Sequence, residues 1–183
     1  MAGARSHGIE DRSETSVSAA PDGSDTSKDC TLSNGASGVF SYTGGAIDQI
    51  VAIGAAAPGG GTFTSIGNAA TNNQLPAIDP SGGVIFSAGA NTPTRTGLFF
   101  FSSSGGGLSK IAATGDVVGP GPLSSIFYVN GMSFGGKVAF QASITGTVTS
   151  GLFVGQSGSP IVPIALNGDL APGGGTLDTT ITS

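Results

Sequence analysis

Short apolar runs alternate with Gly-, Ser- and Pro-rich links from residue 31 onward. Phe, Val, Ile and Thr dominate the runs, as is typical of β-strands, and the links carry the residues that turns require. No stretch of this part shows a helical apolar period over a helical length without a Gly or Pro inside it. The pattern therefore predicts an all-β fold. The strands predicted between positions 97 and 150 are 97–102, 108–114, 125–134 and 137–144.

The runs recur along the chain at nearly equal spacing. A start of the form Gly-aliphatic-Phe occurs three times, at spacings of 59 and 54 residues, at positions 38–40, 97–99 and 151–153. A later run, Gly83–Ala88, matches Lys137–Ala142 at a spacing of 54. Recurrence at one period is typical of stacked repeats and predicts four-stranded antiparallel units of about 54 residues. The units are expected near 37–96, 97–150 and 151–183.

Each unit continues from its Phe through an aliphatic run to a Gly and then a loop. Two of the loops, 57–63 and 171–177, read Ala-Pro-Gly-Gly-Gly-Thr followed by an apolar residue, and 119–123 is a looser version. They do not match a phosphate-binding P-loop, because no Lys follows the glycines and no helix is predicted after them. We interpret these loops as tight connections between strands.

The series Gly-Leu-Phe, Ile-Ala, Gly-Asp, Ala-Pro-Gly-Gly-Gly-Thr and Val-Ala-Phe-Gln-Ala resembles a family of tandem-repeat bacterial proteins of largely unknown function, mostly secreted or surface-exposed. The resemblance covers about residues 37–183. It implies a β-propeller-like array and an extracellular or cell-surface location. The array is expected to be incomplete, with about 2.7 units, whereas propellers typically close with about 4–8 blades. Since open sheets leave strand edges unpaired, we expect self-association or missing repeats of a longer chain.

The charged residues are concentrated near the N-terminus. Residues 1–30 hold 9 of the 17 charged side chains, together with the single His, His7, and the single Cys, Cys30. The few aliphatic residues of this segment cannot bury enough surface to offset the entropy of the chain. We therefore predict a disordered charged tail at 1–30 and a β-repeat domain at 31–183. No apolar h-region follows the first basic residue, so we expect no secretory signal in this segment.

The composition argues against several kinds of site. One Cys and one His rule out a disulfide framework within the chain and a Cys-based or multi-histidine metal site. A Ser- or Cys-based catalytic triad could use only His7 as its base. The formal net charge of -5 argues against nucleic-acid binding, which needs a basic face. No run reaches about 18 apolar residues, so no membrane span is predicted.

Two Asp residues occupy equivalent positions in the repeat. Asp116 and Asp169 each follow the Gly that ends an aliphatic run. Oxygen ligands without His or Cys suit a hard cation such as Ca²⁺, and Asp79, Asn130 and Asn167 could complete its shell of about 6–8 oxygens. The simpler interpretation is that an Asp after Gly accepts hydrogen bonds from backbone amides in a turn.

Two classes of function remain. The first is a binding or structural module, which Ca²⁺ could stabilise and which would bind a small molecule or a glycan on its loops. The second is a Ca²⁺-dependent hydrolase of the propeller lactonase or esterase type, acting on a small lactone or ester. In that class the cation polarises a carbonyl group, and Asp116 and Asp169 are the first catalytic candidates. This alternative depends on analogy between folds, which is weak evidence for function.

Overall fold

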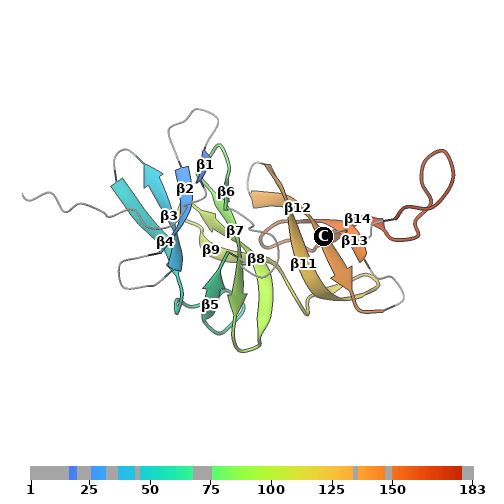
Figure 1. Cartoon of the computed structure of the whole chain (residues 1–183), viewed down its shortest axis with the longest axis horizontal. Coiled ribbons are helices and arrows are strands. Elements are labelled where there is room, and N and C mark those ends of the chain that lie inside the picture. Colours follow the sequence, from blue (N-terminus) through green and yellow to red (C-terminus); the bar gives the residue numbers. More distant parts are fainter. Residues whose placement is uncertain are drawn as a thin grey trace, which may run out of the picture.

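Three antiparallel β-sheets make up the part of the chain that the structure describes (Figure 1). The structure is a computed structural model, and the residues described are 17–19, 26–31, 37–43, 46–67, 76–133, 136–146 and 150–178. They form strands, turns and loops, and no α-helix occurs among them. The all-β fold predicted from the sequence is confirmed.

Each sheet is built from strands that follow one another in the sequence. The N-terminal sheet contains, in spatial order, β1 (Val17–Ala19), β2 (Thr26–Thr31), β3 (Ser37–Thr43) and β4 (Ala46–Ala52). The central sheet contains β5 (Phe63–Ile66), β7 (Val84–Ala90), β8 (Arg95–Ser102) and β9 (Gly107–Ala113), and β6 (Ala77–Ile78) also pairs with β7. The C-terminal sheet contains β10 (Val117–Val118), β11 (Gly121–Ser133), β12 (Lys137–Ile144), β13 (Ser150–Gly155) and β14 (Val162–Leu166).

The four strands predicted between positions 97 and 150 are confirmed as β8, β9, β11 and β12. They do not form one sheet, because β8 and β9 close the central sheet whereas β11 and β12 belong to the C-terminal sheet. The sequence repeat and the sheets are therefore out of phase by two strands. Each sheet ends with an aliphatic run, and the Gly-aliphatic-Phe start lies on its penultimate strand.

Strands β1 and β2 lie within or at the end of the charged segment 1–30, for which the sequence predicts disorder. β2 pairs with β3 from Thr26 opposite Tyr42 to Thr31 opposite Ser37. This pairing uses backbone hydrogen bonds, which any non-proline residue can make. A segment with few apolar side chains can therefore still form a paired strand. The rest of segment 1–30 lies outside the described residues.

A glycine near the start of β3, β8 and β13 is required by close packing. A Cβ atom on Gly97 would lie 2.7 Å from the carbonyl oxygen of Ala112, and 3.2 Å from the ring of Phe99. The corresponding distances to a carbonyl oxygen are 2.6 Å for Gly38 and 2.9 Å for Gly151. A backbone oxygen cannot move aside as a flexible side chain can, which explains why each Gly-aliphatic-Phe start has Gly in this place.

The aliphatic run carries one bulged residue in each sheet. Leu98 pairs with Ala112 and Phe99 pairs with Lys110, which leaves Ile111 as the extra residue of β9. The same shift leaves Ile50 as the extra residue of β4 and Ile164 as that of β14. A β-bulge re-aims the side chains around it. All three sheets therefore carry an Ile at the same bulged position.

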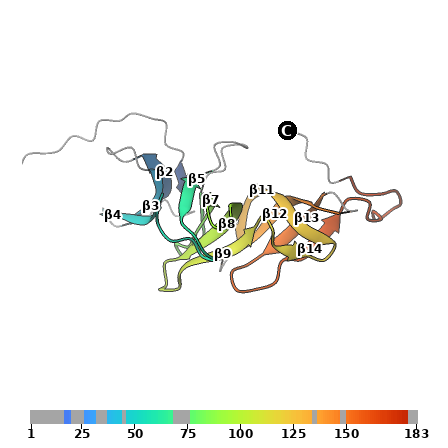
Figure 2. The same ribbon diagram turned by 90° about the horizontal axis from the view of Figure 1, so that it is seen from below.

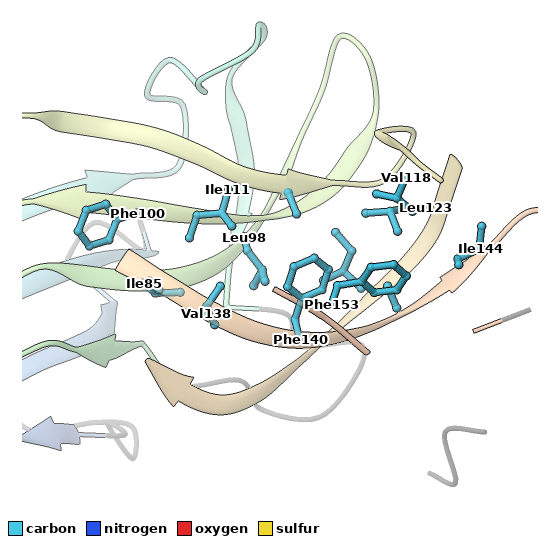
Figure 3. Close-up of a cluster of buried hydrophobic side chains, with 13 residues drawn as sticks. Ile85, Leu98, Phe100, Ile111, Val118, Leu123, Val138, Phe140, Ile144 and Phe153 are labelled. Atoms are coloured by element: carbon cyan, nitrogen blue, oxygen red, sulfur yellow. The ribbon is translucent and has the colours of Figure 1, made fainter. Parts of the chain in front are cut away.

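The three sheets follow one another in chain order along the molecule (Figure 2). They enclose two apolar cores. The first intersheet core lies between the N-terminal and central sheets and consists of Val39, Val51, Ala57, Phe63, Val84, Phe86, Ala88, Ala90 and Phe99. The second intersheet core lies between the central and C-terminal sheets (Figure 3). It consists of Ile85, Leu98, Phe100, Ile111, Ala112, Val118, Leu123, Ile126, Val138, Phe140, Ala142, Ile144 and Phe153.

The two intersheet cores are built alike. In the first, the rings of Phe86 and Phe99 are stacked with centroids 5.9 Å apart and planes at 26°. In the second, Phe140 and Phe153 are stacked at 5.7 Å and 26°. Both pairs are direct cross-strand neighbours, on β7 and β8 and on β12 and β13. The sheets thus repeat their mode of packing as well as their strands, as neighbouring blades of a propeller do.

Candidate functional site

The two Ala-Pro-Gly-Gly-Gly loops have the same backbone hydrogen bonds. The Gly54 amide donates to the Phe63 carbonyl at 2.8 Å, and the Gly168 amide donates to the Leu177 carbonyl at 2.9 Å. The three consecutive glycines have φ of 74–109° in the first loop and 83–100° in the second. Glycine alone adopts such angles without strain. The glycines are therefore explained by the turn itself, which agrees with their interpretation as tight connections.

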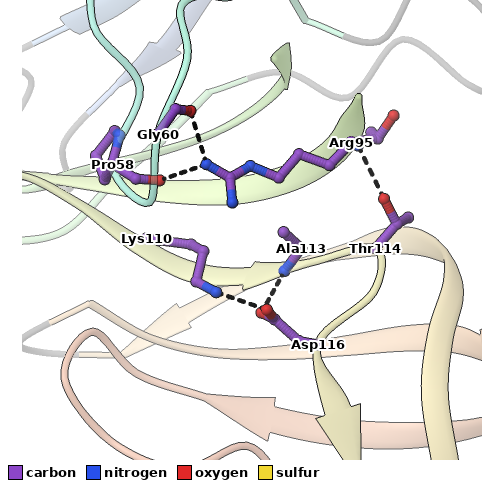
Figure 4. A network of polar contacts seen from close by, with 8 residues as sticks. Pro58, Gly60, Arg95, Lys110, Ala113, Thr114 and Asp116 are labelled. Carbon is purple, nitrogen blue, oxygen red and sulfur yellow. Dashed lines mark hydrogen bonds and ion pairs between the residues drawn. The ribbon is translucent and has the colours of Figure 1, made fainter. Parts of the chain in front are cut away.

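Arg95 ties the first of these loops to the central sheet (Figure 4). Its Nη2 donates to the carbonyl oxygens of Pro58 and Gly60, at 3.1 Å and 2.9 Å, and the side chain is buried. No sequence motif marks this contact, because both acceptors are backbone atoms more than 30 positions earlier. Arg95 therefore has a structural role in fixing the loop.

Asp116 and Asp169 occupy the same place in the turn that follows an aliphatic run. Asp116 Oδ2 accepts a hydrogen bond from the Ala113 amide at 2.8 Å, and Asp169 Oδ2 accepts one from the Leu166 amide at 2.7 Å. In both turns the donor lies three residues before the Asp and near the end of its strand. Each carboxylate thus satisfies a backbone amide locally, a common use of Asp in turns.

Asp116 also forms an ion pair at a shallow pocket between the central and C-terminal sheets (Figure 4). Lys110 Nζ lies 2.6 Å from Asp116 Oδ1, and the two side chains are 30% and 25% exposed. The pocket has a volume of about 380 Å³ and is open to solvent. Val117 and the segment 158–161, which precedes β14, complete its wall. Its chemistry is one ammonium group and one carboxylate within an apolar rim.

Asp79 is a buried turn residue before β7. Its Oδ1 accepts hydrogen bonds from the amides of Ser81 and Gly83, both at 2.8 Å, and from the Ser81 hydroxyl at 2.6 Å. Its Oδ2 is buried and has no hydrogen-bond partner among the described residues.

Asn167 lies in the turn after β14, where its backbone amide donates to the Ser150 carbonyl. Asn130 lies on β11, but its side chain is outside the described residues.

The three Asp residues among the predicted calcium ligands, Asp79, Asp116 and Asp169, do not converge in the part of the chain that is described. No group of three or more His, Cys, Asp or Glu side chains converges there. Both oxygens of Asp116 already have partners, and one partner is the Lys110 ammonium group, which repels a cation. These contacts compete with a cation at Asp116, and the calcium site stays a prediction.

Replacing Asp116 with Ala should lower the free energy of unfolding by about 1 kcal/mol, because a backbone amide loses its acceptor and a part-exposed ion pair is removed. Urea denaturation would measure this change. Asp169→Ala is the matched variant, since it removes the same backbone contact from a more exposed turn, and it should cost less. A loss above about 3 kcal/mol for Asp116→Ala would show a role beyond a single hydrogen bond and ion pair.

Exposed apolar side chains gather at both ends of the row of sheets, and the sequence analysis did not identify them. Ile164 and Val162 on β14 are each 54% exposed, and Tyr42 and Ile47 on β3 and β4 are 44% and 64% exposed. The sequence repeat already contains these apolar positions, because residues equivalent to Ile164 occur in every unit. Only the structure shows which of these residues have a neighbouring sheet among the described residues.

These features define a class of protein made of antiparallel sheets of four or five strands that stack like the blades of an incomplete propeller. The chain belongs to a family of unknown function, DUF7453, whose model matches residues 24–182. No curated protein and no solved structure matches the chain. The described residues contain no helix of the length and hydrophobicity needed to cross a membrane.

Proposed function

We propose that the chain is a β-repeat binding or structural module of a bacterial protein that is secreted or displayed at the cell surface. The observation that carries this proposal is a contrast between the repeated Asp residues and the exposed apolar residues. The repeated Asp residues are engaged by backbone amides, whereas apolar residues of the intersheet type are exposed at the ends of the sheet row. Exposed apolar patches on a folded domain are typical of interaction surfaces.

The Lys110–Asp116 pocket is the second surface that supports a binding role. Its ammonium and carboxylate groups could exchange their mutual contact for hydroxyl groups of a small polar molecule or a glycan. The apolar rim of Val117 and Pro160 would contact the carbon skeleton of such a ligand. The pocket is shallow, so this ligand would be held at the surface of the module.

The calcium-dependent hydrolase is the less well supported alternative. Its cation would need Asp116 and Asp169, and the contacts of Asp116 with Lys110 and the Ala113 amide compete with metal binding. The described residues that line the pocket include no His that could act as a general base, and the single His of the chain, His7, lies outside the described residues.

Turnover assays distinguish the two functions. We expect no chelator-sensitive hydrolysis of any compound in a panel of small lactones and esters. The melting temperature of the module should be the same with added Ca²⁺ and with the chelator, because the Asp116 carboxylate is already held by Lys110 and the Ala113 amide. Chelator-sensitive hydrolysis that is lost in Asp116→Asn would contradict the proposal and favour the hydrolase.

A further inference from the structure

The three bulged Ile residues have different surroundings although their positions in the sheets are the same. Ile50 packs against the first intersheet core, and Ile111 is 3% exposed within the second. A methyl group of Ile111 lies 2.7 Å from the place that a Cβ on Gly155 of the next sheet would take. Ile164 is 54% exposed. The face of the C-terminal sheet around Ile164, called here the C-terminal end face, is therefore one half of an intersheet core.

The opposite half is exposed at the other end of the row. Within the central sheet, Phe101 and Leu108 are cross-strand partners that pack against the first intersheet core. Their equivalents in the N-terminal sheet are Tyr42 and Ile47, which are also cross-strand partners. Because Val39 on the same strand packs into the first core, the alternation of side chains directs Tyr42 to the other face. Tyr42 and Ile47 define the N-terminal end face.

The two end faces therefore match each other as the two sides of an internal interface do. Gly155 of the C-terminal sheet, which Ile111 contacts, is equivalent to Phe101 of the central sheet and to Tyr42 of the N-terminal sheet. An Ile164 placed as Ile111 is placed would contact Tyr42 and Ile47. Neither end face fits itself in this way, since each internal interface joins two different faces.

From this match we infer that the C-terminal end face of one copy of the chain docks on the N-terminal end face of a second copy. Two copies joined in this way place six of the described sheets in one row. A head-to-tail contact of this kind closes when its rotation returns to the start, and two copies then share two identical interfaces. The inference rests on the proposed module function and names its partner as the same chain.

Solution mass tests this inference on the full chain. By light scattering, the wild type should have twice the 17.6 kDa mass of one chain. Ile164→Asp and Ile47→Asp should each raise the dissociation constant of the dimer at least tenfold, because an unpaired carboxylate is costly to bury in an apolar contact. Val117→Asp is the matched control, because Val117 is 78% exposed but lies at the pocket, and it should keep the two-chain mass.

Three results would overturn the inference. They are a monomeric wild type, an Ile47→Asp variant that dimerises as well as the wild type, and a Val117→Asp variant that dissociates as readily as Ile164→Asp. The second result would indicate a symmetric contact between two C-terminal end faces. Circular dichroism of each variant confirms that the sheets remain folded. These outcomes are separate from chelator-sensitive turnover, which tests the proposed module function itself.

Discussion

Replacing Phe99 with Ala should lower the free energy of unfolding by about 3–5 kcal/mol, the loss expected for a buried aromatic side chain. Phe99 is fully buried in the first intersheet core. Its ring meets Phe63 edge to face at 4.9 Å and stacks on Phe86 at 5.9 Å. The cavity would lie between the N-terminal and central sheets, so we expect the two sheets to loosen together. Urea denaturation followed by circular dichroism measures the change.

Phe101→Ala is the matched control for this prediction. Phe101 lies on the same strand two residues later and packs against the same core, but its side chain is only partly buried. Its replacement removes less apolar contact and should therefore cost clearly less. Equal losses for the two variants would show that the first intersheet core is not organised around the Phe63, Phe86 and Phe99 rings.

Replacing Gly97 with Ala should lower the free energy of unfolding by about 2–3 kcal/mol, which is a large effect for one methyl group. The new Cβ would lie 2.7 Å from the Ala112 carbonyl oxygen, which is part of the ladder between β8 and β9. It would also press on the Phe99 ring at 3.2 Å. Relief requires moving the backbone beside the Ile111 bulge, and this would disturb both intersheet cores. Thermal and urea unfolding measure the loss.

Gly106→Ala serves as the control for the glycine prediction. Gly106 lies in the exposed turn between β8 and β9, where the nearest atoms to a new Cβ belong to the Ser102 side chain. The contact is with the Ser102 Cβ at 3.0 Å, in an exposed turn outside both intersheet cores, so the loss of stability should be clearly smaller than for Gly97→Ala. If Gly97→Ala is as well tolerated as Gly106→Ala, the Gly-aliphatic-Phe start does not depend on close packing of the two strands.

Local sequence patterns predicted the strands well, because strand residues and turn residues are clearly separated in this chain. The strand predicted at 137–144 coincides with β12, whose Val138, Phe140, Ala142 and Ile144 all face the second intersheet core. The sequence did not locate the boundary between one sheet and the next. A repeat in sequence has the same period wherever counting begins, so spacing alone could not show that β9 ends the central sheet and β11 belongs to the next.

The candidate site was harder to predict, since equivalent positions in sequence do not show what covers them. The place of Asp116 and Asp169 after a strand is visible in the sequence, but the amides of Ala113 and Leu166 that engage them are not. The hydrogen bonds from Arg95 join positions that lie more than 30 residues apart in the sequence. Likewise, Ile111 and Ile164 look identical in the sequence, and their difference is the presence or absence of a neighbouring sheet.

Cross-linking between the two end faces tests the central claim most directly, namely that they are complementary halves of one interface. An Ile164→Cys chain mixed with an Ile47→Cys chain, both in a Cys30→Ser background, should form a disulfide-linked pair under mild oxidation. Each variant alone should stay unlinked, because Ile164 would face Ile47 and not its own copy. A Val117→Cys chain mixed with Ile47→Cys should also stay unlinked. Efficient linking of Ile164→Cys to itself, or no linking in the mixture, would contradict the head-to-tail assembly.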